Sequence, residues 1–211
     1  MEKDIFDAVI LDVDGTLWNS TPLVAKAWTK AAAECGVEKT ITPEMLKNLF
    51  GKTMHEIADA LMPEASLQLK EKVMYACVEE EERALEENEE DITYPRVAET
   101  IKELAKKIPV CIVSNCQKGY IELFMRKAQV EDSVSDFECY GNTGKGKAEN
   151  LQLLIERNGY QHPVYVGDTV MDEEACARAG VPFIYASYGF GKAKKPIITI
   201  DSFKKLTNIL N

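Results

Sequence analysis

The 211-residue sequence predicts an α/β fold in which a parallel sheet carries helices on both faces and an all-helical segment is inserted. Three observations predict it. Residues 8–12, AVILD, are a continuous apolar run that ends in a carboxylate, which is typical of a strand buried on both faces of a parallel sheet. Residues 21–90 show only helical patterns. From residue 94 onward, helical and strand patterns alternate, as a parallel sheet with crossover helices requires.

The segment after the first strand is expected to be helical throughout. TPLVAKAWTKAAAECG (21–36) is an amphipathic helix that stops at Gly36, and ITPEMLKNLFG (41–51) is a second helix with Thr42 as N-cap and Gly51 after its end. Residues 52–63 and 64–90 complete the block. We interpret the acidic run at 79–90 as a solvated helix face, with an acidic interaction surface as the alternative. The predicted domains are therefore residues 1–17 with 91–211, and residues 18–90.

The rest of the chain supplies the sheet and its covering helices. The patterns predict helices at 96–107, 120–129, 147–158, 172–179 and from Ser202 onward. They predict strands at 110–114, 137–140, 164–167, 182–186 and 197–200.

Composition restricts the partners. The formal charge of −10 disfavours binding to nucleic acid or to an anionic membrane, and it would also repel an anionic substrate unless local cations offset it. The N-terminal apolar run is short and interrupted by Asp12, so no signal peptide is expected, and no stretch reaches 18 apolar residues. The six cysteines contain no CxxC pair, which favours reduced thiols and a cytoplasmic location.

Carboxylates gather where the predicted strands end. Asp12 and Asp14 follow the first strand, Asp168 follows the strand at 164–167, and Asp172 comes one helical turn later. Ser114 and Asn115 end another strand, and Lys147 begins the helix before Asp168. Ligands of open α/β sheets bind at the carboxyl ends of the strands, so these side chains are expected to share one site.

Such a group of carboxylates indicates a hard divalent cation. Carboxylates placed together repel one another, and oxygen ligands of this kind suit Mg²⁺, which usually keeps several waters and recruits phosphate oxygens. A lysine and a hydroxyl nearby would bond the remaining phosphate oxygens. The residues therefore predict a magnesium-dependent site for a phosphorylated ligand.

Four motifs together carry a resemblance to a known family. DVDGTLW (12–18), VSN (113–115), a lysine that starts a helix, and GDTVMD (167–172) resemble the haloacid dehalogenase (HAD) superfamily. The likeness is greatest to its phosphoglycolate phosphatase and β-phosphoglucomutase-like branch. It spans residues 6 to about 210, and residues 167–191 also resemble that branch's fourth motif with the strand and loop after it. The resemblance implies a Rossmann-like core with a helical, C1-type cap at residues 18–90.

The resemblance also implies roles for individual residues. Asp12 would be the nucleophile that forms an aspartyl-phosphate, and Asp14 the general acid and base. Ser114, Asn115 and Lys147 would bind the phosphoryl group. The metal would be held by Asp12, the backbone carbonyl of Asp14 and Asp168, with Asp172 acting from behind these ligands or through water. The implied reaction is Mg²⁺-dependent hydrolysis of a small phosphorylated metabolite, phosphoglycolate-like or sugar-phosphate-like.

The stretch GNTGKGKA (141–148) resembles a nucleotide-binding loop, but we interpret it otherwise. A Walker A motif ends in GK followed by Ser or Thr, whereas Ala148 follows Lys147 here, and only a short part of the chain remains for the rest of such a domain. Its glycines are then expected to form a flexible approach to Lys147. Lys145 is a rival for the same role. Lys147 is preferred because the apolar positions of the following helix have the spacing expected directly after it.

The helical segment offers weaker candidates. Lys52 lies at a helix start, where it is a possible contact for a second charged group of the substrate, or simply an exposed lysine. His55, one turn later, is interpreted as an ordinary helix residue. A sugar-phosphate mutase remains an alternative function, since it would use the same two aspartates. Phosphonate cleavage through Lys52 and a non-catalytic binding protein on the same scaffold also stay open. The oligomeric state is not predicted.

Overall fold

The computed structural model describes residues 6–210, and the chain divides into two compact units. The α/β unit is Met1–Asn19 with Ile92–Asn211, and the helical unit is Ser20–Asp91. The unit limits thus fall one or two residues later than the predicted domain limits, and Trp18 belongs to the α/β unit. The expectation of no signal peptide concerns the N-terminal segment, of which residues 1–5 lie outside the described residues.

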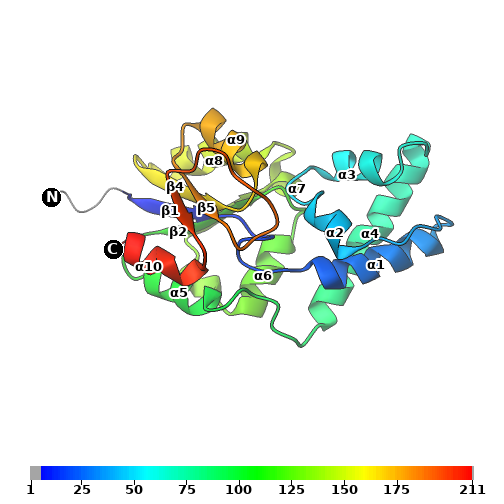
Figure 1. Cartoon of the computed structure of the whole chain (residues 1–211), viewed down its shortest axis with the longest axis horizontal. Helices are drawn as coiled ribbons and strands as arrows, with labels where there is room; N and C mark the ends of the chain where they lie inside the picture. The colour runs from blue at the N-terminus through cyan, green and yellow to red at the C-terminus, as the bar shows by residue number, and fades with distance from the viewer. Residues whose placement is uncertain (1–5, 211) are drawn as a thin grey trace. The chain divides into compact units, whose positions relative to one another are not determined.

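The α/β unit is built on a six-stranded parallel sheet in the order β3-β2-β1-β4-β5-β6, which confirms the predicted fold class (Figure 1). The central strand β1 pairs in parallel with β2 and β4, so that Leu11 lies opposite Ile112 on one side and Val166 on the other. All four residues of β1 are buried, as the continuous apolar run predicted. The strand bounds are β1 Ala8–Leu11, β2 Val110–Ser114, β3 Asp136–Cys139, β4 Pro163–Gly167, β5 Phe183–Ala186 and β6 Ile198–Ile200.

Helices cover both faces of this sheet (Figure 1). α5 (Val97–Leu104), α6 (Tyr120–Ala128) and α10 (Leu206–Ile209) lie on one face, and α8 (Lys147–Asn158) and α9 (Val170–Ala179) lie on the other. Part of the core is a cluster in which the apolar face of α8 packs against the sheet and α9. Its members include Ile10, Val113, Leu151, Leu154, Tyr165, Cys176 and Phe183. Short 3₁₀ helices stand at Glu131–Ser133 and Phe203–Lys205.

The glycine-containing stretch before Lys147 was expected to be a flexible loop, but part of it is folded. β3 ends at Cys139, and residues Tyr140–Thr143 form a short helix, α7, where the pattern predicted the last strand residue and a loop. Gly141 is packed so closely that a Cβ there would lie 2.0 Å from the backbone nitrogen of Lys118. The glycine is thus needed for a close backbone approach.

Several helix ends differ from the prediction, and α9 and α2 (Pro43–Lys47) are two examples. α9 begins at Val170, two residues before the predicted start, because Thr169 caps it and Asp172 completes a capping box. The pattern T-V-M-D is the sequence signal for this start. α2 is shorter than predicted, although Thr42 caps it as expected by accepting a hydrogen bond from the Met45 backbone N–H.

The helical unit consists of four helices and contains no strand, as predicted from residues 21–90. α1 (Thr21–Glu34) packs along α4 (Leu67–Glu87), with α2 and α3 (Met54–Leu61) beside them. Within this unit the indole Nε1 of Trp28 donates to Glu81 Oε2 over 2.6 Å, and both side chains are buried. Between α3 and α4 lies a pocket of about 260 Å³. It is lined by four apolar residues and four polar or charged ones, namely Met54, Ala58, Leu67 and Met74, and His55, Asp59, Lys70 and Glu71.

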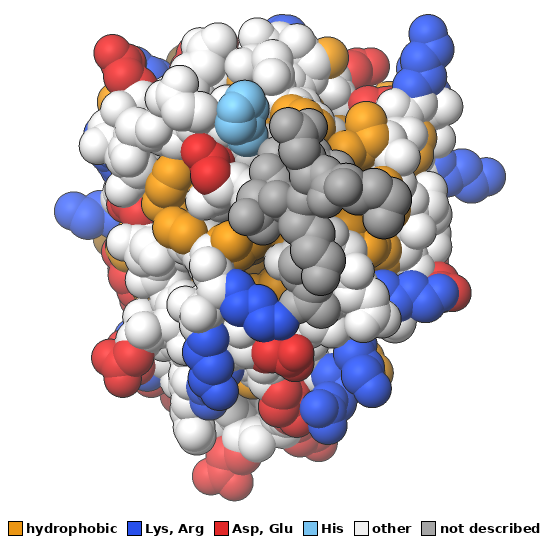
Figure 2. Space-filling model, turned by 90° about the vertical axis from the view of Figure 1, so that its left-hand side faces the viewer, with side chains coloured by type: hydrophobic (Ala, Val, Ile, Leu, Met, Phe, Trp, Pro, Cys, Tyr) orange, Lys and Arg blue, Asp and Glu red, His pale blue; other side chains and the backbone are white. Residues whose placement is uncertain are grey.

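The surface carries mixed charges, and the described helices show no membrane span. On the face of the molecule drawn in Figure 2, basic side chains are interspersed with acidic ones, and neither sign forms a continuous patch. Among residues 6–210, no helix has both the length and the apolarity to cross a membrane. The cytoplasmic location stays a prediction.

Candidate active site

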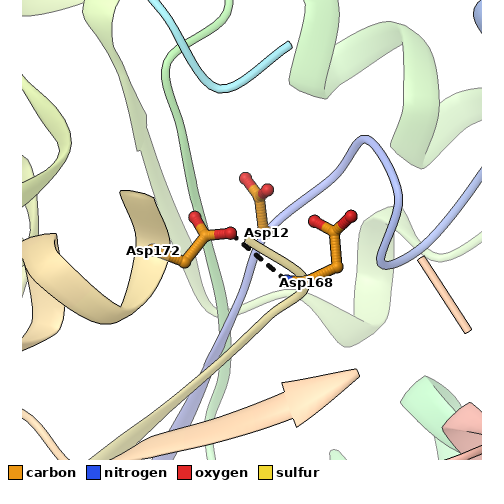
Figure 3. Close-up of side chains that lie close together, drawn as sticks. All are labelled: Asp12, Asp168 and Asp172. Atoms are coloured by element: carbon orange, nitrogen blue, oxygen red, sulfur yellow. Dashed lines mark hydrogen bonds between the residues drawn. The ribbon is translucent and has the colours of Figure 1, made fainter. Parts of the chain in front are cut away.

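The strand ends bring the predicted carboxylates to one edge of the sheet. Asp12 directly follows β1 and Asp168 directly follows β4, and these strands are neighbours in parallel register. Asp172 lies in the first turn of α9. Each of the three offers one ligand oxygen, and these oxygens lie within 4.8 Å of one another. Figure 3 shows the three carboxylates facing the same space beyond the strand ends.

Lys147 lies within this group. Its Nζ donates to Asp12 Oδ1 over 2.9 Å and also forms a short ion pair with Asp172 Oδ1. All three side chains are buried, and the ring of Tyr165 lies below the ammonium group, 5.5 Å from it. Lys147 is the first residue of α8, so its position follows from where that helix begins.

Burial and charge act in opposite directions on this group. Desolvation raises the pKa of Asp12, while the positive charge of Lys147 and hydrogen bonds from Lys147 and Ser114 lower it. Burial also disfavours the charged form of Lys147, but the Asp12 and Asp172 carboxylates outweigh this and raise the pKa of Lys147. Lys147 therefore stays positively charged at neutral pH, although it is enclosed.

Asp172 is held by the start of its own helix. Its Oδ2 accepts from the backbone N–H groups of Asp168 and Thr169, over 3.2 and 2.9 Å, and from the Thr169 hydroxyl over 2.7 Å. Figure 3 marks the first of these bonds. Since Oδ1 meets Lys147, both oxygens are engaged. Asp172 thus orients Lys147 and connects it to the turn that carries Asp168.

Asp168 is enclosed by backbone. The Phe190 N–H donates to Asp168 Oδ2 over 2.6 Å, whereas Asp168 Oδ1 is buried and has no hydrogen-bond partner among the described residues. A Cβ on Gly15, whose φ is +80°, would lie 2.2 Å from Asp168 Oδ2, and one on Gly189 would lie 2.3 Å from Asp168 Cβ. Both glycines therefore let loops approach this carboxylate closely.

The charges of the site fit a divalent cation. Asp12, Asp168 and Asp172 face one ammonium group, so two negative charges are left over. Burial, followed by the charges of Asp172 and Asp12, raises the pKa of Asp168 well above its usual value in the metal-free protein. A buried acceptor without a partner is costly unless something binds it, and Asp168 Oδ1 is such an acceptor. A hard cation with oxygen ligands meets both requirements.

Asp14 lies in the turn after β1, and two aromatic residues hold its side chain. Trp18 Nε1 and the Tyr120 hydroxyl both donate to Asp14 Oδ1, over 3.1 and 2.8 Å. Tyr120 is the first residue of α6, which begins after Gly119 in the left-handed conformation. Thr16, in the same turn, has a buried hydroxyl without a hydrogen-bond partner among the described residues.

The remaining candidates lie in different places. Ser114 ends β2 beside Asp12 and is buried, and Asn115 follows it half-buried. Lys145 is exposed, two residues before α8, and only its backbone takes part in the local bonds with Thr143 and Asn150. Lys147 and not Lys145 is thus the lysine among the carboxylates. Lys52 belongs to the helical unit, on the turn before α3, and His55 is exposed on that helix.

Sequence reasoning missed two contacts of the site. The Tyr120–Asp14 bond joins residues 106 positions apart, and a tyrosine at a helix start gives no signal of it. Phe190, whose N–H binds Asp168, lies in the loop SYGFG after β5. The glycines of that loop were a usable signal, because closely spaced glycines after a strand allow backbone to approach a ligand group.

A family model described as "Haloacid dehalogenase-like hydrolase" matches residues 9–186 of this chain. The chain belongs to this family. The match runs from β1 to the end of β5 and so contains every α/β-unit candidate named above.

Individual proteins extend the likeness to the whole chain. A phosphoglycolate phosphatase of Aliivibrio fischeri is 24% identical, with 96% of each chain covered. One of Synechococcus elongatus is 26% identical over 87% of this chain and 84% of its own length. The crystal structure of a predicted phosphoglycolate phosphatase from Haemophilus somnus superposes with a TM-score of 0.87 at 19% identity and covers all of both chains. That structural likeness establishes the fold.

Proposed function

We propose that this protein is a Mg²⁺-dependent phosphatase that hydrolyses small phosphate monoesters through an aspartyl-phosphate on Asp12. That it is a phosphatase of the haloacid dehalogenase-like family follows from the family match and from its relatives along nearly the whole chain. The cofactor, the covalent intermediate and the substrate class are the proposal. The observation that carries it is buried Lys147, which is bonded to Asp12. Asp12 lies in one cluster with Asp168, whose Oδ1 has no hydrogen-bond partner among the described residues.

The metal is proposed to bind Asp12, the backbone carbonyl of Asp14 and Asp168, with Asp172 behind them. The engagement of both Asp172 oxygens by Lys147 and the start of α9 supports this indirect role. When bound, Mg²⁺ would supply positive charge that lets a carboxylate approach a negatively charged phosphoryl group.

The protein residues then divide the reaction between them. An oxygen of Asp12 attacks phosphorus and the ester P–O bond breaks, while Asp14 gives its proton to the leaving oxygen. In the second half, the Asp14 carboxylate takes a proton from water, whose oxygen attacks phosphorus and releases phosphate and free Asp12. Lys147, Ser114 and Asn115 bind the phosphoryl oxygens, where charge grows in the transition state.

The substrate proposed is phosphoglycolate or a sugar phosphate. The first choice rests on the activity by which the two relatives are named. The helical unit is proposed to act as a cap that excludes water from the site, with Lys52 as a contact for the substrate's second charged group.

The test is phosphate release from a panel of esters, with Mg²⁺ or with EDTA. The panel holds phosphoglycolate, hexose phosphates, nucleoside monophosphates and p-nitrophenyl phosphate. We expect turnover in Mg²⁺ and none in EDTA. Asp12→Asn should abolish turnover, whereas Asp7→Asn, at the other end of β1, should not, because the Asp7 side chain accepts from the backbone of Gln161 and His162.

The covalent step has its own readout. Asp14→Asn, mixed with p-nitrophenyl phosphate and quenched in acid, should gain the mass of one phosphoryl group, because the ester has a good leaving group but water is no longer activated. Isomerisation of a hexose phosphate without phosphate release would instead indicate a mutase. Absence of turnover and of the mass gain would contradict the proposal.

A further inference from the structure

Two buried aromatic donors converge on one oxygen of Asp14. The indole Nε1 of Trp18 and the hydroxyl of Tyr120 both end on Oδ1, over 3.1 and 2.8 Å. Trp18 is 1% exposed and Tyr120 is 4% exposed, so neither group exchanges freely between this carboxylate and water. Two donors on one oxygen fix the plane of the carboxyl group as well as its position.

The donors themselves have little freedom. The ring of Trp18 packs edge-on against Tyr120 and Phe124, with centroids 5.5 and 5.2 Å away. The backbone of Trp18 forms bridges with Asp14 on one side and with Thr93 on the other. Its carbonyl also accepts from the Gly15 N–H over 3.0 Å. The indole is thus fixed by packing and by backbone bonds.

Satisfying a tyrosine hydroxyl does not require a carboxylate. In the same unit, the hydroxyl groups of Tyr165, Tyr185 and Tyr188 donate to backbone carbonyls over 2.8 to 2.9 Å. Tyr120 instead donates to an acidic side chain from another part of the chain. The Tyr120 hydroxyl therefore holds the Asp14 carboxyl group in place. A tyrosine that only needed a hydrogen-bond acceptor could have used a backbone carbonyl.

We infer that Trp18 and Tyr120 are positioning residues that hold Asp14 in the orientation needed to protonate the leaving oxygen. The inference rests on the proposed role of Asp14 as general acid. Because Oδ1 accepts both bonds, the inference assigns the transferable proton to Oδ2. Fixing which oxygen carries the proton and where it points reduces the reorganisation needed during the reaction.

This predicts a dependence on the leaving group. An alkyl phosphate needs its leaving oxygen protonated, whereas p-nitrophenolate leaves readily without a proton. Loss of the positioning should therefore slow formation of the aspartyl-phosphate from the alkyl ester and spare its formation from the aryl ester. Hydrolysis of the aspartyl-phosphate also uses Asp14 and is common to both esters, so the first step is the one to compare. A general loss of folding or of phosphate binding would lower both.

The experiment measures, by rapid acid quench, the maximal rate of aspartyl-phosphate formation and its half-saturating substrate concentration in Tyr120→Phe and Trp18→Phe. The substrates are phosphoglycolate, or the best alkyl ester of the panel, and p-nitrophenyl phosphate. We expect the rate of aspartyl-phosphate formation from the alkyl ester to fall by about tenfold or more in each variant, within the range of general acid catalysis. The half-saturating concentrations and the rate of aspartyl-phosphate formation from the aryl ester should stay within about twofold. Tyr160→Phe is the matched control, because its hydroxyl meets the Cys111 sulfur instead, and it should leave the ratio of the two rates unchanged.

Asp14→Asn separates failure of this inference from failure of the proposed function. A selective loss of aspartyl-phosphate formation from the alkyl ester in Asp14→Asn, but not in the aromatic variants, would overturn the inference and leave the general acid in place. No selective loss in Asp14→Asn would remove Asp14 as the acid. Equal or higher rates in Tyr120→Phe with both esters would also overturn the inference. Either aromatic variant suffices, should the other fail to fold.

Discussion

The two units bury charge in different ways. In the helical unit, Glu81 is the one buried charged side chain among residues 20–91, and it accepts a hydrogen bond from Trp28. At the strand edge of the α/β unit, three carboxylates and Lys147 are buried together, and Asp168 keeps an oxygen without a hydrogen-bond partner among the described residues. The first arrangement is complete in itself. The second is complete only with a ligand, which indicates that chemistry and not stability keeps it.

The net charge is also divided unequally between the two units. Residues 20–91 contain sixteen acidic and eight basic residues, so the helical unit carries most of the formal charge of −10. The rest of the chain has nineteen acidic and seventeen basic residues. The overall charge therefore says little about the site, where one lysine among carboxylates sets the local balance.

The largest effect is expected from Lys147→Met. It leaves the Asp12 and Asp172 carboxylates buried without their cation, which should cost roughly 3–5 kcal/mol of unfolding free energy in EDTA. Activity should fall by about a thousandfold or more, because in the proposed mechanism the phosphoryl group loses its cation. Urea denaturation and phosphate release measure the two effects.

Lys145→Met is the matched control, since it changes the same residue type two positions earlier. Lys145 is exposed, so both stability and activity should stay close to those of the unchanged protein. Similar losses in the two variants would mean that the contrast between an enclosed and a solvated lysine is wrong.

Asp168→Asn should affect activity and stability in opposite directions. Activity should fall by about a thousandfold, because the proposed metal site loses a ligand. In EDTA the variant should unfold a few degrees higher, since roughly 1 kcal/mol corresponds to 2–4 °C at this chain length. The physical reason is that burial, and then Asp172 and Asp12, raise the pKa of Asp168, so its ionised form destabilises the metal-free fold at neutral pH.

The raised pKa of Asp168 also predicts how the stability of the metal-free protein changes with pH. A carboxyl group whose pKa is raised by folding contributes stability at low pH and loses it as pH rises through the folded-state pKa. In EDTA, thermal unfolding should show this loss in the unchanged protein and a smaller one in Asp168→Asn. Asp136→Asn is the control, because Arg157 pairs with that carboxylate at 2.7 Å, and it should lower the melting temperature. A lower melting temperature in both variants would contradict the argument.

The parts of the site that lie along single motifs could be predicted from the sequence. A strand that ends in DVDGT fixes where Asp12 and Asp14 lie, and GDTVMD does the same for Asp168 and Asp172, because parallel strands end at the same edge. The preference for Lys147 over Lys145 followed from the phase of the apolar residues in α8. The sequence pattern of α8 was sufficient for this choice, since the start of the helix determines where Lys147 lies.

Contacts between distant elements could not be predicted in this way. The Tyr120 hydroxyl reaches Asp14 only because α6 packs beside the turn after β1, and the Phe190 N–H reaches Asp168 only through the path of the loop after β5. The close packing of Gly141 on the backbone of Lys118 is of the same kind. Such contacts depend on how elements pack, which periodicity within one element does not encode.

Glu81→Ala should affect stability alone. It removes the buried acceptor of the Trp28 N–H, and leaving a buried donor unpaired costs about 1–3 kcal/mol. Activity per folded molecule should not change, in contrast to the variants at the strand edge. Glu82→Ala, at the next position of α4, is the control, and its stability should change by less than about 0.5 kcal/mol. Loss of activity in folded Glu81→Ala would break the division between the units.

The smallest effect compares one buried thiol from each unit. Burial raises the pKa of Cys77, in the helical unit, to about 12 and that of Cys111, in the α/β unit, to about 11. A group whose pKa is raised by folding contributes stability below its unfolded-state pKa and loses it as pH rises toward the folded-state value. Each thiol should therefore remove on the order of 1 kcal/mol of unfolding free energy between pH 8 and pH 10.

Cys77→Ala and Cys111→Ala test this by urea denaturation at both pH values. Each variant is less stable than the unchanged protein at pH 8 because it opens a small cavity, but its stability should fall less between pH 8 and pH 10. The same slope in all three proteins would contradict the argument. Because desolvation is the leading cause of the raised thiol pKa in both units, similar changes in slope are expected. The buried carboxylates differ in this respect, since Glu81 accepts a hydrogen bond from Trp28, whereas burial and neighbouring charges raise the pKa of Asp168. A change in slope for Cys77→Ala alone would show that the β2 thiol is less enclosed than the thiol in α4.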